Sequence, residues 1–279
     1  MTHPTDISPL TRVVGRLDRA APGEVDPGMI PSRFPSIDRA IGGGFRRGDL
    51  VVMGGDDSAG TSALALAIAL RITPRALLLT GEMPAERAYE RALAMGAKVP
   101  LESLRLGVVT DVERARLAAA AVMLRDRAPV IDTLTTGAIS AVADALRGTP
   151  DVPLVVVDPL ECLLTRDAGR DEALGYAVLS LKRLALERNV VVLLTAHLPQ
   201  LEQSRLDRRP RLTDFGLGGA IGTHADLVLG LYREELYEAD LGVSGAAELL
   251  VLKHRDGAKG YIDLYFDRRY CRFEDVLEE

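Results

Sequence analysis

Residues 49–71 read DLVVMGGDDSAGTSALALAIALR, and three kinds of sequence follow one another in this stretch. Asp49 to Met53 is a short apolar run typical of a buried strand. Gly54 to Gly60 is rich in glycine and therefore predicts a loop. Ser62 to Arg71 consists mainly of alanine and leucine, which have high helix propensity. Strand, glycine-rich loop and helix in this order are the context that a phosphate-binding loop requires.

The loop matches the phosphate-binding template GxxxxGK[ST] at both glycines and at the final hydroxyl. The glycines allow the backbone to curl so that its N–H groups face a phosphate at the start of the helix. The hydroxyl of Ser62 is of the kind that binds Mg²⁺. An ordinary glycine-rich turn explains the glycine spacing equally well. The nucleotide-binding residues predicted by the first interpretation are Gly55, Ser58, Gly60, Thr61 and Ser62.

The same loop departs from the template where charge matters most. Thr61 stands in the position of the lysine, which is the main point charge on the β- and γ-phosphates of a bound nucleotide. Asp56 and Asp57 add two carboxylates that repel a phosphate within screening distance. The loop therefore has the shape of a phosphate site without its usual charge.

Further apolar strands alternate with helices on the carboxyl side of the loop. The predicted strands cover residues 76–80, 130–131, 152–158 and 190–196, and the predicted helices cover residues 84–95, 111–127, 139–146 and 171–188. Strands that are apolar on both faces indicate a mostly parallel sheet with helices on both sides, and hence an α/β fold. Residues 225–232, 247–254 and 260–266 predict hairpin-connected antiparallel strands at one edge of the sheet.

Composition bounds the class of protein. The chain has 279 residues and a net charge of −6, which argues against a globally basic nucleic-acid coat. Its 47% hydrophobic content excludes a disordered chain, and aromatic residues, at 4%, are too few for extensive base stacking. Two cysteines, Cys162 and Cys271, suit a reducing cytoplasm, and no apolar run reaches the length of a membrane span. We expect an N-terminal arm over residues 1–27 and one domain over residues 28–279.

Two acidic residues follow predicted strands and strengthen the nucleotide interpretation. Asp158 ends the run VPLVVVD, where a carboxylate would hold Mg²⁺ together with Ser62. Glu82 follows the strand at residues 76–80 and is placed to orient a water at the γ-phosphate. A strand-end Asp that caps a turn and a Glu at a helix N-terminus are the structural alternatives. Because the carboxyl ends of parallel strands share one edge of the sheet, the combination favours a nucleotide site.

With these residues identified, the chain resembles the RecA-like C-terminal ATPase domain of DnaB-type (superfamily 4) replicative DNA helicases over about residues 28–275. The resemblance starts at residues 30–39 (IPSRFPSIDR) and includes residues 80–83 (TGEM), residues 155–158 (VVVD), the series from 209 to 233, and residues 253–257 (KHRDG). It implies ATP and Mg²⁺ as ligands and a hexameric ring in which neighbouring subunits complete each site. It assigns Glu82 as catalytic base, Ser62 and Asp158 as metal ligands, and Lys253 and Arg255 as the basic pair that reaches the neighbour's γ-phosphate.

Departures from the family pattern concern both ligands. His197 occupies the place of the glutamine that senses the γ-phosphate. Residues 216–218 (GLG) replace the Arg-Glu-Ser of a loop that contacts the DNA backbone, which removes a phosphate contact. Arg208, Arg209 and Arg211 form a basic run nearby, either as a residual groove for single-stranded DNA or as a solvated loop.

The N-terminal arm contains one helical pattern. Leu10, Val13, Val14 and Leu17 have the spacing of a single helix face. A short helix of this kind packs either on its own domain or on a neighbouring subunit. The resemblance implies the second, because this segment (about residues 9–20) corresponds to the linker helix of the family.

Two functions remain open at this point. The first is an ATP-binding, helicase-like protein of DNA replication or repair, in which Arg46, Arg47 or a neighbour's Lys253 replaces the missing lysine. The second is a pseudo-ATPase that acts as a structural or regulatory subunit, or as a member of a mixed ring with a competent helicase. A RecA- or KaiC-like regulatory ATPase is a third and weaker alternative, because residues 209–214 (RPRLTD) and 253–257 favour the DnaB type.

Overall fold

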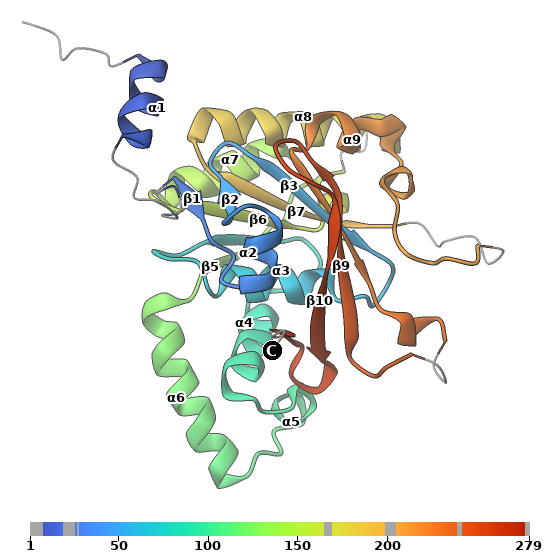
Figure 1. The fold of residues 1–279 in the computed structure, drawn as a ribbon. Helices are drawn as coiled ribbons and strands as arrows, with labels where there is room; N and C mark the ends of the chain where they lie inside the picture. Colours follow the sequence, from blue (N-terminus) through green and yellow to red (C-terminus); the bar gives the residue numbers. More distant parts are fainter. Residues whose placement is uncertain are drawn as a thin grey trace, which may run out of the picture.

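The computed structural model describes residues 8–18, 26, 28–164, 169–198, 205–238 and 242–276. Within these ranges the chain forms a nine-stranded sheet with the order β11-β10-β9-β8-β3-β7-β6-β4-β5 (Figure 1). The strands are β3 (Leu50–Gly55), β4 (Leu77–Thr80), β5 (Val130–Thr133), β6 (Leu154–Asp158), β7 (Val191–His197), β8 (Leu227–Tyr232), β9 (Ala246–His254), β10 (Gly260–Asp267) and β11 (Arg272–Asp275).

The six strands from β3 to β8 pair in parallel with their neighbours. The strands β9, β10 and β11 then extend the sheet beyond β8 by antiparallel pairing. This confirms the predicted fold class, a mostly parallel α/β sheet with antiparallel edge strands at its C-terminal end. A separate two-stranded ribbon consists of β1 (Met29–Ile30) and β2 (Phe45–Arg46).

Helices cover both faces of the sheet. They are α1 (Pro9–Leu17), α2 (Pro35–Ala40), α3 (Thr61–Ala69), α4 (Ala85–Ala97), α5 (Leu101–Leu106), α6 (Asp111–Arg127), α7 (Ile139–Gly148), α8 (Arg170–Arg188) and α9 (Ala220–His224), with short 3₁₀ turns η1 (Leu160–Leu163), η2 (Leu212–Phe215), η3 (Leu217–Gly219), η4 (Glu234–Leu236) and η5 (Arg268–Tyr270). None of the helices in the described ranges is long and apolar enough to cross a bilayer.

The alternation of side chains along β3 divides the core into two parts. Val51 and Met53 point toward α3 and α4, while Leu50 and Val52 point toward α7 and α8. All six residues of β3 are buried, which explains why the strand is apolar on both faces. In α3, every residue from Ala63 to Ala69 is buried, so the helix that follows the glycine-rich loop is fixed firmly against the sheet.

Two peripheral helices have little contact with this core. In Figure 1, α1 lies apart from the body of the domain, and α6 packs against α4 on the outside. The predicted linker helix begins at Pro9 and is described as far as Asp18; its predicted end at residue 20 lies outside the described residues, as do residues 1–7 and 277–279.

Candidate functional site

The glycine-rich loop connects the carboxyl end of β3 to the start of α3. A side chain at Gly55 would place its Cβ atom 2.9 Å from the Cβ of Ala59 and 3.0 Å from the carbonyl oxygen of Leu231. Gly60 has a φ of +104° and lies against the ring of Phe273. Both glycines of the motif are therefore required by local geometry, the first by crowding and the second by its backbone conformation.

Ser62 and Asp158 meet directly beside this loop. The Ser62 hydroxyl donates a hydrogen bond of 2.8 Å to Oδ1 of Asp158, and the Thr195 hydroxyl donates another of 2.5 Å to the same atom. Burial raises the pKa of Asp158 above its usual value, whereas these two hydrogen bonds lower it. The two predicted metal ligands are thus brought together as a hydroxyl–carboxylate pair, which is a donor set suited to Mg²⁺.

A cation at this pair would need further ligands. No group of three or more His, Cys, Asp or Glu side chains within the described ranges is arranged to hold a metal ion. Phosphate oxygens and water are the remaining ligands that Mg²⁺ usually takes at such sites. The residues therefore fit a magnesium ion that arrives with a nucleotide rather than a resident metal.

Glu82 and His197 lie at the carboxyl ends of β4 and β7, the two strands that flank β6. Their side chains are joined by a contact of 3.3 Å between Nε2 of His197 and Oε1 of Glu82. The other ring nitrogen of His197 lies 3.9 Å from a carboxylate oxygen of Asp57 in the loop. His197 therefore stands between the predicted catalytic base and the acidic part of the phosphate loop.

Parallel strands explain why these residues converge. Glu82 follows β4, Asp158 ends β6 and His197 ends β7, and these strands run side by side in one direction. Gly81 makes room for the turn after β4, because a Cβ atom there would lie 2.1 Å from the Cβ of Cys162. Burial and nearby carboxylates raise the pKa of the Cys162 thiol to about 12, so it is an unreactive part of the packing.

Glu161 is a further acidic residue of this edge that the sequence patterns did not reveal. Its carboxylate accepts hydrogen bonds from the backbone N–H of His197 at 3.3 and 3.5 Å. Burial raises the pKa of Glu161. The residue lies in η1, whose position depends on packing rather than on a motif. Only its closeness to Asp158 in the sequence hinted at a role.

Three arginines line the cavity of about 500 Å³ beside the phosphate loop, as far as the described residues show. They are Arg91 on α4, Arg233 after β8 and Arg268 in η5. The positive charge of Arg91 lowers the pKa of Asp158, which places that charge close to the metal-ligand pair. Sequence reasoning did not identify these arginines, because α4, β8 and η5 reach the cavity only through the tertiary fold.

Arg233 supports the loop through contacts inside the chain. Its guanidinium is buried, forms an ion pair with Glu235 and lies 4.5 Å from the centre of the Phe266 ring. One of its terminal nitrogens donates a 3.0 Å hydrogen bond to the carbonyl oxygen of Ser58. Ser58 itself has a φ of +65°, so this hydrogen bond helps to hold an uncommon backbone conformation in the loop.

The two sequence candidates for replacing the lysine in the same subunit lie elsewhere. Arg46 pairs with Asp256 at 2.8 Å, and Arg47 donates a 3.0 Å hydrogen bond to the carbonyl oxygen of Asn189. Both precede the amino end of β3, whereas the phosphate loop follows its carboxyl end. That suggestion is therefore wrong for the subunit's own loop, where Arg91 and Arg268 are the cations at hand.

The carboxylate of Asp56 is turned toward a tyrosine. The hydroxyl of Tyr237 donates a 2.8 Å hydrogen bond to Oδ2 of Asp56, and burial together with this bond raises the pKa of Tyr237. Tyr237 stacks on Tyr232 with ring centres 5.6 Å apart. The guanidinium of Arg208 lies over the ring of Tyr237 at 5.4 Å. One of the two loop carboxylates is thus engaged at the side of the cavity.

The predicted DNA-binding arginines have different surroundings. Arg209 forms two hydrogen bonds of 2.5 and 2.6 Å with Glu248 and lies 4.9 Å from the centre of the Tyr232 ring. Arg211 has an exposed side chain. Of the three candidates, Arg211 is therefore the most accessible to a nucleic acid, whereas the guanidinium of Arg209 is occupied within the chain.

Lys253 and Arg255 lie at the opposite edge from the phosphate loop. Lys253 donates hydrogen bonds to the carbonyl oxygens of Gly222 (2.8 Å) and Ala225 (2.5 Å). The register pairs His254 with Leu227, which lies beside Val51 near the amino end of β3. The four residues from there to Gly55 span about 13 Å along the strand. The predicted basic pair is therefore separated from its own loop by the length of β3.

The fold and the site together define a RecA-like domain of the P-loop class: a parallel sheet, a phosphate loop after its central strand, and acidic residues on the neighbouring strand ends. The family model of the DnaB-like helicase C terminal domain matches residues 29–275. The chain therefore belongs to this family, which confirms the resemblance inferred from the sequence.

Individual relatives agree with this assignment. The chain is 28% identical over 259 residues to the replicative DNA helicase DnaB of Geobacillus stearothermophilus, covering 88% of the chain and 56% of the relative. It is 27% identical over 257 residues to the replicative DNA helicase DnaC of Bacillus subtilis, with the same coverage. The chain thus spans about half the length of the curated relatives it matches.

Solved structures share the fold. One of them, an ATPase domain, superposes with a TM-score of 0.84 at 24% identity, covering 96% of the chain and 97% of that domain. A DnaB-like replicative helicase, studied with its interactions with primase, gives 0.86 at 23% identity, covering 98% of the chain and 69% of that structure. These likenesses establish the RecA-like architecture of the chain.

Proposed function

We propose that this chain is a helicase-like subunit of a DnaB-type ring that acts on DNA in replication or repair and binds ATP with Mg²⁺ at the loop of residues 55–62, with hydrolysis weakened by Thr61. The observation that supports this most is that Ser62 and His197 line one cavity, where Ser62 is hydrogen-bonded to Asp158 and His197 contacts Glu82. A turn without function would not need a hydroxyl, a buried carboxylate and a second acid from three different segments.

The residues divide the work at this site. When bound, ATP with Mg²⁺ supplies the phosphoanhydride to be cleaved and the charge that the acidic groups neutralise. Ser62 and Asp158 hold the cation, and the backbone N–H groups of the loop face the phosphates. Glu82 holds a water molecule and accepts its proton, and His197 fixes the position of the Glu82 carboxylate. Arg91 and Arg268 provide positive charge from the cavity wall.

Thr61 is the main reason to expect weak binding of ATP. A charge-assisted contact of the missing lysine is worth about 1.5–3 kcal/mol, or roughly one to two decades in affinity. Asp57 adds a carboxylate that is largely exposed and that, within the described ranges, forms no ion pair at hydrogen-bonding distance. We therefore expect weak ATP binding and slow turnover.

Replacing Thr61 by lysine tests this proposal. We expect Thr61→Lys to bind ATP with Mg²⁺ about 10- to 100-fold more tightly than the wild-type chain, because the ammonium restores the contact with the phosphates. Calorimetric titration measures the affinity, and hydrolysis with and without single-stranded DNA measures turnover. Thr61→Gln serves as the matched control, since it adds length without charge.

Three results would contradict the proposal in different ways. Ordinary turnover by the wild-type chain that Glu82→Gln abolishes would show that hydrolysis is not weakened. Absence of ATP binding by both the wild type and Thr61→Lys would show that the loop is not a nucleotide site. Turnover that DNA does not change in Thr61→Lys would argue against an action on DNA.

A second candidate function is a non-catalytic subunit that serves a competent helicase in a mixed ring. The placement of Lys253 and Arg255 favours it, because they are far from their own loop and need a neighbouring subunit's site to act on. A copy with a weak site of its own can still donate this basic pair. Addition of the chain to a competent helicase would then change the helicase's hydrolysis rate, and Arg255→Ala would abolish the change.

A further inference from the structure

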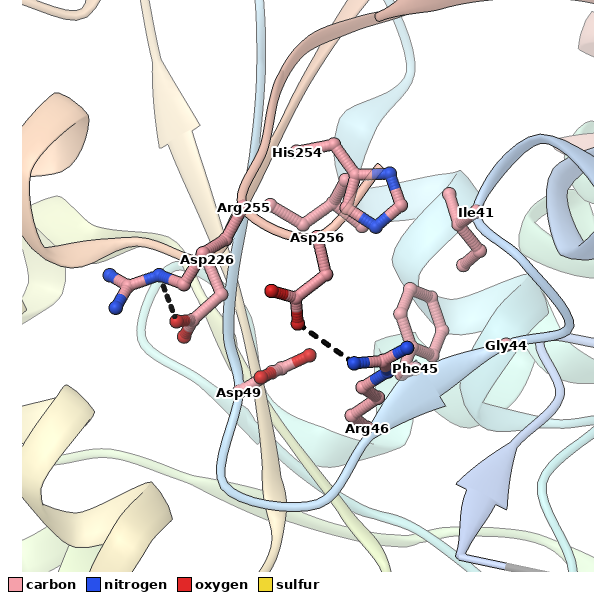
Figure 2. Close-up of a pocket in the computed structure, with 10 residues that line it drawn as sticks. Ile41, Gly44, Phe45, Arg46, Asp49, Asp226, His254, Arg255 and Asp256 are labelled. Atoms are coloured by element: carbon pink, nitrogen blue, oxygen red, sulfur yellow. Dashed lines mark hydrogen bonds and ion pairs between the residues drawn. The ribbon is translucent and has the colours of Figure 1, made fainter. Parts of the chain in front are cut away.

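We propose that Asp226 positions the side chain of Arg255 for a neighbouring copy of the chain, an inference that rests on the role in the neighbour's site proposed above for Arg255. Asp226 is buried directly before β8, and Figure 2 shows it beside Arg255 at the edge of a pocket that Asp49 and His254 also line. The argument depends on which nitrogens of Arg255 this carboxylate occupies and which it leaves available.

The carboxylate of Asp226 accepts two hydrogen bonds and forms an ion pair with Arg255. Oδ1 lies 2.9 Å from Nε of Arg255. Oδ2 accepts a 2.6 Å hydrogen bond from the ammonium of Lys182 and a 2.8 Å hydrogen bond from the backbone N–H of Leu50. Lys182 also donates to the carbonyl oxygen of Gly48 at 2.7 Å. A buried charge that is satisfied in this way is held in one orientation.

Arg255 is held through its inner nitrogen only. Its backbone N–H donates a 2.8 Å hydrogen bond to the carbonyl oxygen of Asp226, so main chain and side chain are both fixed to one residue. The side chain is 51% exposed, and its terminal nitrogens have no hydrogen-bond partner among the described residues. In Figure 2 these nitrogens point away from the pocket. The outer edge of the guanidinium is thus left to bind an anion from outside with two parallel hydrogen bonds.

The segment before β8 holds the other cation as well. Lys253 is bound by the carbonyl oxygens of Gly222 and Ala225, and burial together with the charge of Arg255 lowers its pKa. Residues 222–226 therefore arrange both members of the basic pair. Asp226 is the member of this segment that acts on Arg255 through a charged side chain, so its effect can be removed without altering the backbone.

Asp226 also ties Arg255 to the strand that carries the phosphate loop. Its hydrogen bond with Leu50 joins it to the amino end of β3, and Gly55 at the carboxyl end begins the loop. All residues of β3 are buried, and close packing in a protein interior resists deformation. A subunit's own loop and its Arg255 are therefore connected to opposite ends of one buried strand.

A mixture of two variants tests the assignment. Both partners carry Thr61→Lys to allow turnover. The donor also carries Glu82→Gln, which disables its own site, and the acceptor carries Lys253→Ala and Arg255→Ala. Hydrolysis by this reference mixture can arise only where a donor's basic pair completes an acceptor's site. We expect Asp226→Asn in the donor to lower kcat at least tenfold, and the same substitution in the acceptor to have an effect at least tenfold smaller.

The outcomes separate this inference from the proposed function. A reference mixture without activity would overturn the proposed neighbour site, and this inference with it. An active reference mixture in which Asp226→Asn acts equally from either partner would leave the proposed function intact and show Asp226 to be structural only. Arg255→Lys in the donor covers the case in which Asp226→Asn does not fold. It keeps the charge but lacks Nε, so the same loss is expected, and unchanged activity would overturn the inference.

A direct measurement does not depend on activity. The Nε–H signal of Arg255 in a ¹⁵N NMR spectrum of the wild-type chain should exchange slowly with water, and Arg255→Lys assigns it by its loss. Asp226→Asn should accelerate the exchange at least tenfold. Asp49→Asn is the matched control, because Asp49 lines the same pocket, and in the described part of the chain no hydrogen bond or ion pair joins it to Arg255. Equal exchange in wild type and Asp226→Asn would contradict the inference.

Discussion

The carboxyl group of Asp49 has its pKa raised from 3.8 to about 6, because burial and the charge of Asp226 disfavour its ionised form. The charges of Lys182 and Arg46 and a hydrogen bond from the backbone of Arg46 oppose this shift without cancelling it. The folded chain therefore binds a proton at Asp49 in a pH range in which the unfolded chain has released it. The contribution of Asp49 to the free energy of unfolding consequently falls as the pH rises from 3.8 to about 6.

Replacing Asp49 by asparagine should remove this dependence. We expect Asp49→Asn to be more stable than the wild type at about pH 8, and the difference to vanish at about pH 4, where both side chains are neutral. Urea unfolding at the two pH values measures it. Asp256→Asn, in the same pocket but half exposed, should show a smaller pH-dependent difference. A gain for Asp49→Asn that is equal at both pH values would refute the role of ionisation.

Asp56 shows how an acidic residue is accommodated in a phosphate loop. Its carboxylate accepts the hydrogen bond of Tyr237, which in turn stacks on Tyr232 beneath Arg209. From sequence alone Asp56 and Asp57 are two equal obstacles to phosphate. The structure distinguishes them, because Asp56 has a neutral donor at the side of the cavity whereas Asp57 lies near His197.

At the scale of elements, the sequence predicted the buried strands well and the short ones poorly. The predicted strands at residues 76–80, 152–158 and 190–196 differ by a few residues at most from β4, β6 and β7, because burial on both faces demands a continuous apolar run. The β1–β2 ribbon, α2, α5 and β11 were not predicted. Each is short, and its sequence has too few residues to display a period.

The residues of the candidate site also fall into those that the sequence predicted and those that it did not. Ser62, Asp158 and Glu82 were predicted together because each is attached to a strand end or to the loop, and parallel topology brings such positions to one edge. His197 was predicted from the family resemblance. Arg91 and Arg268, which line the cavity, and Glu161, which accepts a hydrogen bond from the backbone of His197, were not predicted, because helix packing and 3₁₀ turns place them there.

β11 is the unpredicted element with the largest effect on the site. Phe273 in β11 is fully buried, lies 4.5 Å from Phe266 in β10, and contacts Gly60 of the phosphate loop. We expect Phe273→Ala to lower the free energy of unfolding by about 3–5 kcal/mol, because it leaves a cavity behind the loop. Urea unfolding measures this loss.

The control for this variant is Tyr261→Ala in β10, because Tyr261 is 68% exposed and should cost less than about 0.5 kcal/mol. A loss below about 1 kcal/mol for Phe273→Ala would mean that β11 does not support the loop.

At the scale of the whole molecule, α1 presents an apolar face that the described part of its own chain does not cover. Leu10 is 72% and Leu17 is 65% exposed, and Val13 and Val14 lie between them on the same face. The helix is capped by the Ser8 side chain, which accepts a hydrogen bond from the backbone of Thr11. We propose a second copy of the chain as the partner of this face.

Removal of the helix tests this proposal. Deletion of residues 1–20 should lower the assembly state seen by analytical ultracentrifugation, with or without nucleotide, because the contact between copies loses its apolar helix. Serine at the four apolar positions of α1 should have the same effect, whereas Asp18→Asn at the end of the helix should not. An unchanged oligomer after the deletion would mean that α1 serves another purpose.

The separation of the phosphate loop and Arg255 along β3 has a consequence for how copies join. If Arg255 of each subunit completes the phosphate loop of a neighbour, as proposed above, subunits can associate only head to tail, so the two contacting surfaces differ. In an open row of such subunits, the phosphate loop at one end has no neighbouring Arg255, and the Arg255 at the other end has no neighbouring loop. Closure of the row into a ring removes both ends at once. A subunit whose own phosphate loop is defective can still offer its Arg255 to the next subunit. A single defective member therefore interrupts one junction of the ring and leaves the next intact.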